Sequence, residues 1–75
     1  MPAKPRTPQA KFAANIARLR EGRGLTQEQL GWASGVDQTV VARVESGERK
    51  PNLGTIFKLA RGLEVPPAKL FDGID

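Results

Sequence analysis

Apolar residues recur at helical spacing along most of the chain, and polar or glycine-containing segments separate the helical stretches. From position 11 onward, Phe12, Ile16 and Leu19 fall at i, i+4 and i+7 with charged residues between them, which is the pattern of an amphipathic helix. Gly22 and Gly24 follow, and glycine readily adopts the left-handed backbone that ends a helix. The sequence therefore predicts a first helix that begins at position 11 and ends at these glycines.

Two short helices are predicted next. Thr26 and Gln29 are spaced as in a capping box, in which each side chain satisfies the other residue's backbone amide. A helix of about two turns follows to Ser34, and Gly35 ends it. Asp37 is a good N-cap for a third helix, which we expect to stop at the glycine at position 47.

The last third of the chain has one clear helical period and then a proline-rich break. Asn52 can cap a fourth helix whose apolar residues share one side: Leu53, Ile56, Leu59, Ala60 and Leu63. Pro66 and Pro67 interrupt this pattern, and proline at a first helical position predicts a brief fifth helix. The pattern indicates no strand, internal repeat or phosphate-binding glycine loop, so an all-α fold is expected.

One domain is expected, because 75 residues can bury only one core. Residues 1–10 hold three of the six prolines and are predicted to be a disordered basic tail, with the folded domain at 11–75. The sequence lacks cysteine and histidine, so neither a disulfide nor a usual zinc site is expected, and no cofactor is predicted. Apolar runs too short for a signal peptide or a membrane span favour a cytoplasmic protein with no membrane partner.

Positive charge is concentrated in two stretches of the chain. Lysine and arginine outnumber aspartate and glutamate by 12 to 8, and the excess lies in residues 1–23 and 43–61, whereas residues 64–75 are acidic. This asymmetry favours a polyanionic partner on one side of the molecule. An enzyme is the weakest interpretation, because histidine, cysteine and tyrosine are absent and no carboxylate or lysine pair has a recognisable catalytic spacing.

Residues 27–46 combine a two-turn helix, a tight turn and a second helix, the arrangement of a helix-turn-helix. Over about Phe12 to Phe71 the chain resembles the phage-repressor and Cro type helix-turn-helix family, which is also called lambda repressor-like or XRE-like. The resemblance rests on these residues: Leu25-Thr26-Gln27-Glu28-Gln29-Leu30, Gly35-Val36-Asp37-Gln38, Val41, Val44-Glu45-Ser46-Gly47, Pro51, Leu59-Ala60 and Leu63.

The resemblance implies a compact five-helix bundle with the helix-turn-helix at helices 2 and 3. It also implies a homodimer that binds a pseudo-palindromic operator in double-stranded DNA and regulates transcription, with a recognition helix at about 37–46 in the major groove. The family's base-reading positions fall on Gln38, Thr39 and Arg43. Their chemistry is suitable, because glutamine pairs with adenine, arginine pairs with guanine, and threonine offers a hydroxyl and a methyl group.

Further roles follow from the same resemblance. Gln27 matches a position that contacts phosphate and braces the reading glutamine, and Arg23, Arg49 and Lys50 are further phosphate candidates, although ordinary surface charge explains these three equally well. The pair Arg20 and Glu45 is expected to bridge the first helix to the end of the reading helix. The basic tail is equally compatible with a DNA contact and with a solubilising end.

Three residues depart from the family pattern. Asp37 stands where Ser or Thr is common, which places a carboxylate near the DNA backbone, and Gly31 replaces a favoured alanine and permits close packing on the third helix. Trp32 occupies a usually polar, exposed position. We expect it to be a partly buried surface aromatic, and packing against the tail or a partner is also compatible with it.

Apolar residues in the C-terminal half are candidates for a dimer surface: Phe57, Leu70, Phe71 and Ile74. For Leu70 we favour a place in the monomer core. No small-molecule effector is expected, because no ligand-binding segment follows the helix-turn-helix in this sequence. A phage switch, a restriction-modification controller and a stand-alone regulator all fit, and the alternative from another class is an antitoxin that masks a partner protein, with DNA binding secondary.

Overall fold

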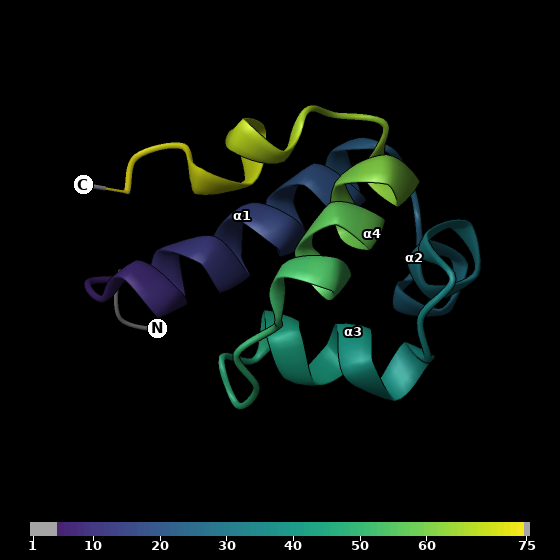
Figure 1. Cartoon of the computed structure of the whole chain (residues 1–75), viewed down its shortest axis with the longest axis horizontal. Helices are drawn as coiled ribbons and strands as arrows, with labels where there is room; N and C mark the ends of the chain where they lie inside the picture. Colours follow the sequence, from purple (N-terminus) through teal and green to yellow (C-terminus); the bar gives the residue numbers. More distant parts are fainter. Residues whose placement is uncertain (1–4, 75) are drawn as a thin grey trace.

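The computed structural model describes residues 5–74 and shows an all-α fold (Figure 1). Its elements, in chain order, are α1 Pro8–Gly22, α2 Gln27–Ser34, α3 Gln38–Glu45, α4 Leu53–Leu63 and the 3₁₀ helix η1 Pro67–Phe71. Figure 1 shows α3 along the lower edge, α2 at the right and α4 in front of α1. Helix α2 packs against both α3 and α4, and η1 packs against α1 and α4. No helix in the described part is long and apolar enough to cross a membrane.

Helix α1 begins earlier than the apolar pattern predicts. Thr7 is its N-cap, with the Thr7 side chain accepting a hydrogen bond from the Ala10 amide at 3.0 Å, and Pro8 occupies the first helical position. Residues 8–10 are therefore part of the helix, and the predicted boundary of the tail at position 10 is wrong. The Thr-Pro pair is a recognisable start signal, because proline lacks the amide that would be unpaired there. Residues 1–4 of the predicted tail lie outside the described residues.

The predicted caps of the next three helices are confirmed. Thr26 and Gln29 form both hydrogen bonds of a capping box, at 2.8 and 3.0 Å. Asp37 accepts a hydrogen bond from the Thr39 amide at 2.8 Å, and Asn52 accepts one from the Thr55 amide at 2.8 Å. Each cap involves residues no more than three positions apart, so the local sequence is sufficient to specify it.

The fifth helix is a 3₁₀ helix, so within residues 5–74 the expected five-helix bundle is corrected to four α-helices and one 3₁₀ helix. The Lys69 amide bonds to the Pro66 carbonyl at 2.9 Å, an i to i+3 contact. The segment has only five residues, with Pro66 as its N-cap and Pro67 as its first residue, and short segments often adopt this tighter geometry. Asn15 then clamps the segment to α1, because its side-chain amide donates to the carbonyls of Leu70 and Asp72, both at 2.9 Å.

One apolar core joins all five elements. Its largest fully buried side chains are Ile16, Leu30, Leu59, Leu63, Leu70, Val41 and Val44. Leu70 is fully buried, so its placement in the monomer core is confirmed and it is removed from the dimer candidates. Because α3 buries two of its three valines, Val41 and Val44, in this core, its opposite face is left to the solvent.

Two glycines set how closely α2 approaches its neighbours. A Cβ atom on Gly62 of α4 would overlap Ser34 Oγ of α2 and lie 3.0 Å from Ser34 Cα. A Cβ atom on Gly31 of α2 would lie 2.8 Å from the Val36 carbonyl oxygen and 3.3 Å from the Gln38 amide nitrogen. The expected close packing of Gly31 on the third helix is confirmed, and the contact is made with the turn and first residue of α3.

Candidate nucleic-acid interface

The predicted base-reading residues lie together on the outer face of α3. Gln38, Thr39 and Arg43 are exposed, whereas Val41 and Val44 on the other side of the helix are buried. The arginine side chain keeps 55% of its surface exposed, and its contact with Glu48 is a loose ion pair at 3.9 Å. The outward set of an amide, a hydroxyl and a guanidinium is therefore free to meet a ligand.

A nearly buried ion pair holds the C-terminal end of α3 against α1. The expected pair forms and is bidentate, because Arg20 Nε donates to Glu45 Oε2 at 2.6 Å and Arg20 Nη2 donates to Glu45 Oε1 at 3.0 Å. The side chains are 16% and 7% exposed. These hydrogen bonds raise the pKa of Arg20 although burial opposes the charged form. A third bond, from Arg20 Nη1 to the Leu25 carbonyl at 2.8 Å, fixes the start of α2 as well.

Gln27 is engaged by this ion pair. Its side-chain amide donates to Glu45 Oε1 at 3.1 Å, so one carboxylate ties α1, α2 and α3 together. In this arrangement the Gln27 side chain supports Glu45. It was expected to support the reading glutamine, Gln38, and the structure does not show that contact. The sequence predicted that Gln27 and Glu45 both matter, but it did not indicate that they touch.

The loop after α3 supplies two exposed cations beside Arg43. Arg49 and Lys50 line a shallow polar hollow together with Gln9, Arg43 and Glu48. The loop is held in place because Gln9 Nε2 donates to the Gly47 carbonyl at 2.6 Å and the Arg49 amide donates to the Arg43 carbonyl at 3.1 Å. Sequence reasoning missed Gln9, since it lies 38 residues from its partner and within the segment predicted to be disordered.

Arg23 is not part of this group. Its guanidinium pairs with the carboxylate of Glu64, the C-cap residue that follows α4, and the two side chains are 42% and 68% exposed. The structure therefore brings Arg43, Arg49 and Lys50 together but engages Arg23 with the end of another helix.

A partly exposed apolar surface lies away from the outer face of α3. Leu53 and Phe57 on α4 are 71% and 57% exposed, and Phe71 is 43% exposed. Phe71 also borders an apolar hollow of about 240 Å³, which is lined by Pro8, Gln9, Phe12, Lys50, Pro51, Ile56, Phe71 and Ile74. The sequence pattern placed Leu53 with the core-facing residues of its helix, and the structure corrects this, because the first turn of α4 extends past the core.

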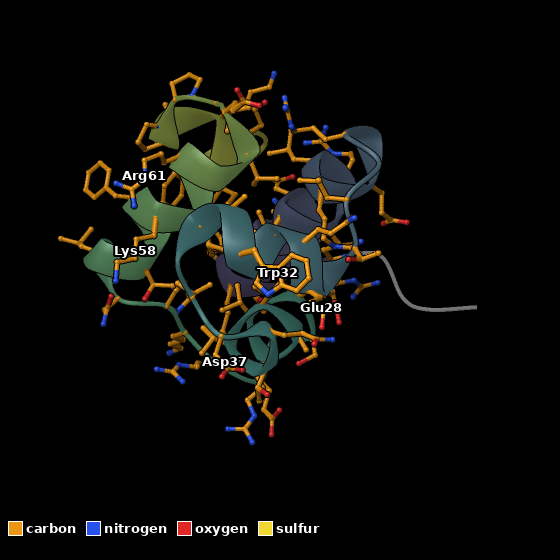
Figure 2. The ribbon with its side chains drawn as sticks, turned by 90° about the vertical axis from the view of Figure 1, so that its right-hand side faces the viewer. Glu28, Trp32, Asp37, Lys58 and Arg61 are labelled. Carbon is orange, nitrogen blue, oxygen red and sulfur yellow. The ribbon has the colours of Figure 1, made fainter. Side chains whose placement is uncertain are left out.

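Trp32 is the most exposed large apolar side chain, at 74%. Figure 2 shows its indole on the outer surface of α2, near Glu28, with Lys58 and Arg61 on neighbouring α4. The expectation that this residue is partly buried is wrong, because α2 turns the opposite face, with Leu30 and Ser34, toward the core.

Comparisons with known proteins agree with this geometry. The HTH_3 helix-turn-helix family model matches residues 16–70. The HTH-type transcriptional regulator y4dJ of Sinorhizobium fredii is 39% identical over 62 residues, which are 83% of this chain and 80% of that protein. Control protein C.SmaI of Serratia marcescens is 38% identical over 59 residues, 79% of this chain and 70% of that protein.

Solved structures give the same picture. The restriction-modification controller protein C.AhdI from Aeromonas hydrophila superimposes with a TM-score of 0.82 at 41% identity, covering 84% of this chain and 96% of that chain. Other relatives are longer, since the match spans only 33% of SutR of Escherichia coli and 42% of RghR of Bacillus subtilis. The family match covers more than half of the sequence, and the chain therefore belongs to the HTH_3 helix-turn-helix family.

Proposed function

We propose that this protein is a transcriptional regulator that binds a pseudo-palindromic operator in double-stranded DNA as a homodimer. The observation that carries the proposal is the outward set Gln38, Thr39 and Arg43 on a helix whose other face is buried. The major groove is about 12 Å wide and admits one α-helix. Helices α2 and α3 form the DNA-binding unit, with α3 in the groove.

Each outward side chain has a defined task in this proposal. Gln38 pairs with adenine, Arg43 pairs with guanine O6 and N7, and Thr39 meets a thymine methyl group or a polar base edge. Arg49 and Lys50 meet phosphates beside the groove, and the backbone amide of Gln27 at the N-terminus of α2 favours an anion. The ion pair between Arg20 and Glu45 sets the angle at which α3 is presented.

A second subunit supplies the remaining specificity, because one such module reads only a few base pairs. Two recognition helices about 34 Å apart meet successive major grooves on one side of the duplex. We assign the subunit contact to the apolar surface formed by Leu53, Phe57, Phe71 and Ile74, whose first three members expose large apolar areas. Occupancy of the operator then rises with protein concentration, because dimerisation and operator binding are coupled.

Control of restriction-modification genes is the biological role that the comparisons favour. The relatives include control protein C.SmaI, at 38% identity, and the restriction-modification controller C.AhdI, at 41% identity. We therefore place the protein with concentration-dependent controllers of this kind.

Selection of bound sites from random duplex DNA tests the proposal, with the oligomer measured in parallel by sedimentation. We expect an inverted repeat, a dimeric complex and binding that weakens with salt at a slope near −0.9 per phosphate neutralised. Arg43→Ala should relax preference at one base pair per half-site, and Arg61→Ala, an exposed arginine on α4 (Figure 2), is the charge-matched control. Equal effects of the two variants, or an unchanged motif in Arg43→Ala, would refute the assigned role of Arg43.

A further inference from the structure

Asp37 stands at the leading end of α3, directly before Gln38 and Thr39. Its backbone is extended and its Oδ1 accepts a hydrogen bond from the Thr39 amide at 2.8 Å. The side chain is exposed, and within residues 5–74 no lysine or arginine pairs with it. Figure 2 shows Asp37 at the turn between α2 and α3, below Trp32. A carboxylate carries about four lone pairs on two oxygens, so the cap leaves acceptor capacity unused.

DNA offers two kinds of group to a carboxylate at this place. Phosphates are anionic acceptors and repel it. In the major groove the exocyclic amines of cytosine N4 and adenine N6 are donors, whereas guanine O6 and thymine O4 are acceptors. A desolvated carboxylate therefore accepts a hydrogen bond from cytosine or adenine and is repelled by the acceptor atoms of guanine and thymine. Both effects favour cytosine or adenine over the other two bases.

We propose that Asp37 is a further specificity-determining residue, which accepts a hydrogen bond from an exocyclic amine of cytosine or adenine at the base pair next to the one read by Gln38. The inference rests on the proposed DNA-binding function and deepens it. The cap and the reading use different lone pairs, so one side chain performs both tasks.

Asp37→Asn and Asp37→Ser are the informative variants, because asparagine and serine are good N-caps and both remove the charge. Thermal melting of both should match the parent protein, which shows that the fold is intact. The parent protein should prefer cytosine or adenine at one position of each half-site by about fivefold to a hundredfold. Affinities for four duplexes that differ only at that base pair then show whether cytosine or adenine is preferred. Asp37→Ser should lose the preference, and Asp37→Asn, which pairs well with adenine, should lose discrimination against guanine and thymine where cytosine is the native base.

Two results would overturn the inference. If Asp37→Ser binds every duplex more tightly by one common factor, the carboxylate only repels phosphate. If both variants keep the parent motif and affinity, Asp37 is only a helix cap. A parent protein that selects no motif at all would refute the proposed function and this inference with it, whereas a motif that depends on Arg43 and not on Asp37 refutes the inference alone.

Discussion

Gly31→Ala tests whether the contact between α2 and the start of α3 controls DNA reading. Alanine is better than glycine in a helix by about 1 kcal/mol. In this structure, however, the new Cβ atom would lie 2.8 Å from the Val36 carbonyl oxygen and 3.3 Å from the Gln38 amide nitrogen. Both neighbours are backbone atoms, so the steric overlap can be relieved only by a shift of the turn that positions Gln38. Overpacking of this kind costs about 1–3 kcal/mol.

The net loss expected for Gly31→Ala is therefore about 0–2 kcal/mol of unfolding free energy. Gly54→Ala is the matched control, because Gly54 is an exposed helical glycine whose new Cβ atom would meet only Asn52 Oδ1 at 3.4 Å. With about 4–8 °C of melting temperature per kcal/mol, the variant at position 31 should melt at least about 4 °C below the control. Circular dichroism measures this difference, and fluorescence anisotropy on the selected operator should show weaker binding for Gly31→Ala alone. Equal melting temperatures with equal operator affinity would refute the reasoning.

Three further outcomes are expected. Glu45→Ala leaves the Arg20 guanidinium without its nearly buried acceptor and should lower the unfolding free energy by about 3–5 kcal/mol in urea titrations; a loss below about 1 kcal/mol would show that the pair contributes little. Asn15→Ala removes the side-chain amide that donates to the carbonyls of Leu70 and Asp72, so residues 70–74 should become sensitive to protease at a cost of about 1–3 kcal/mol, and unchanged cleavage would argue against the clamp. Phe57→Ser should weaken the dimer in sedimentation experiments without lowering the melting temperature of the monomer, because the ring is 57% exposed; an unchanged dimer would remove Phe57 from the interface.

Most of the helices could be predicted from the sequence because their start signals are local. Thr26, Asp37 and Asn52 each bond to an amide two or three residues away, and such contacts do not depend on the rest of the chain. The start of α1 was misplaced because the Thr-Pro signal lies outside the apolar period. The position of the fifth helix was predicted correctly. Its 3₁₀ type was not, because the hydrogen bonds of this five-residue segment are set by its packing on α1 and α4.

The outward placement of Gln38, Thr39 and Arg43 was also predictable, since the buried valines of α3 define its inner face. The hydrogen-bond and ion-pair partners of Gln27 and Arg23 were not predictable from the sequence. Gln27 bonds to Glu45 over 18 positions and Arg23 pairs with Glu64 over 41, and no periodicity relates residues at these separations. The exposure of Trp32 was misjudged for a related reason, because the orientation of α2 is set by its contacts with α3 and α4.

The amino-acid sequence by itself determined that the fold is all-α, which residues cap α2, α3 and α4, and which outward residues of α3 have the chemistry to read DNA. These features depend on contacts within about four residues and on one helical period. Only the tertiary structure decided which polar groups meet across helices, how closely glycine allows α2 to approach α3, and which apolar residues remain uncovered. Those outcomes depend on the relative placement of whole helices, which the packing of a shared core sets and no single segment encodes.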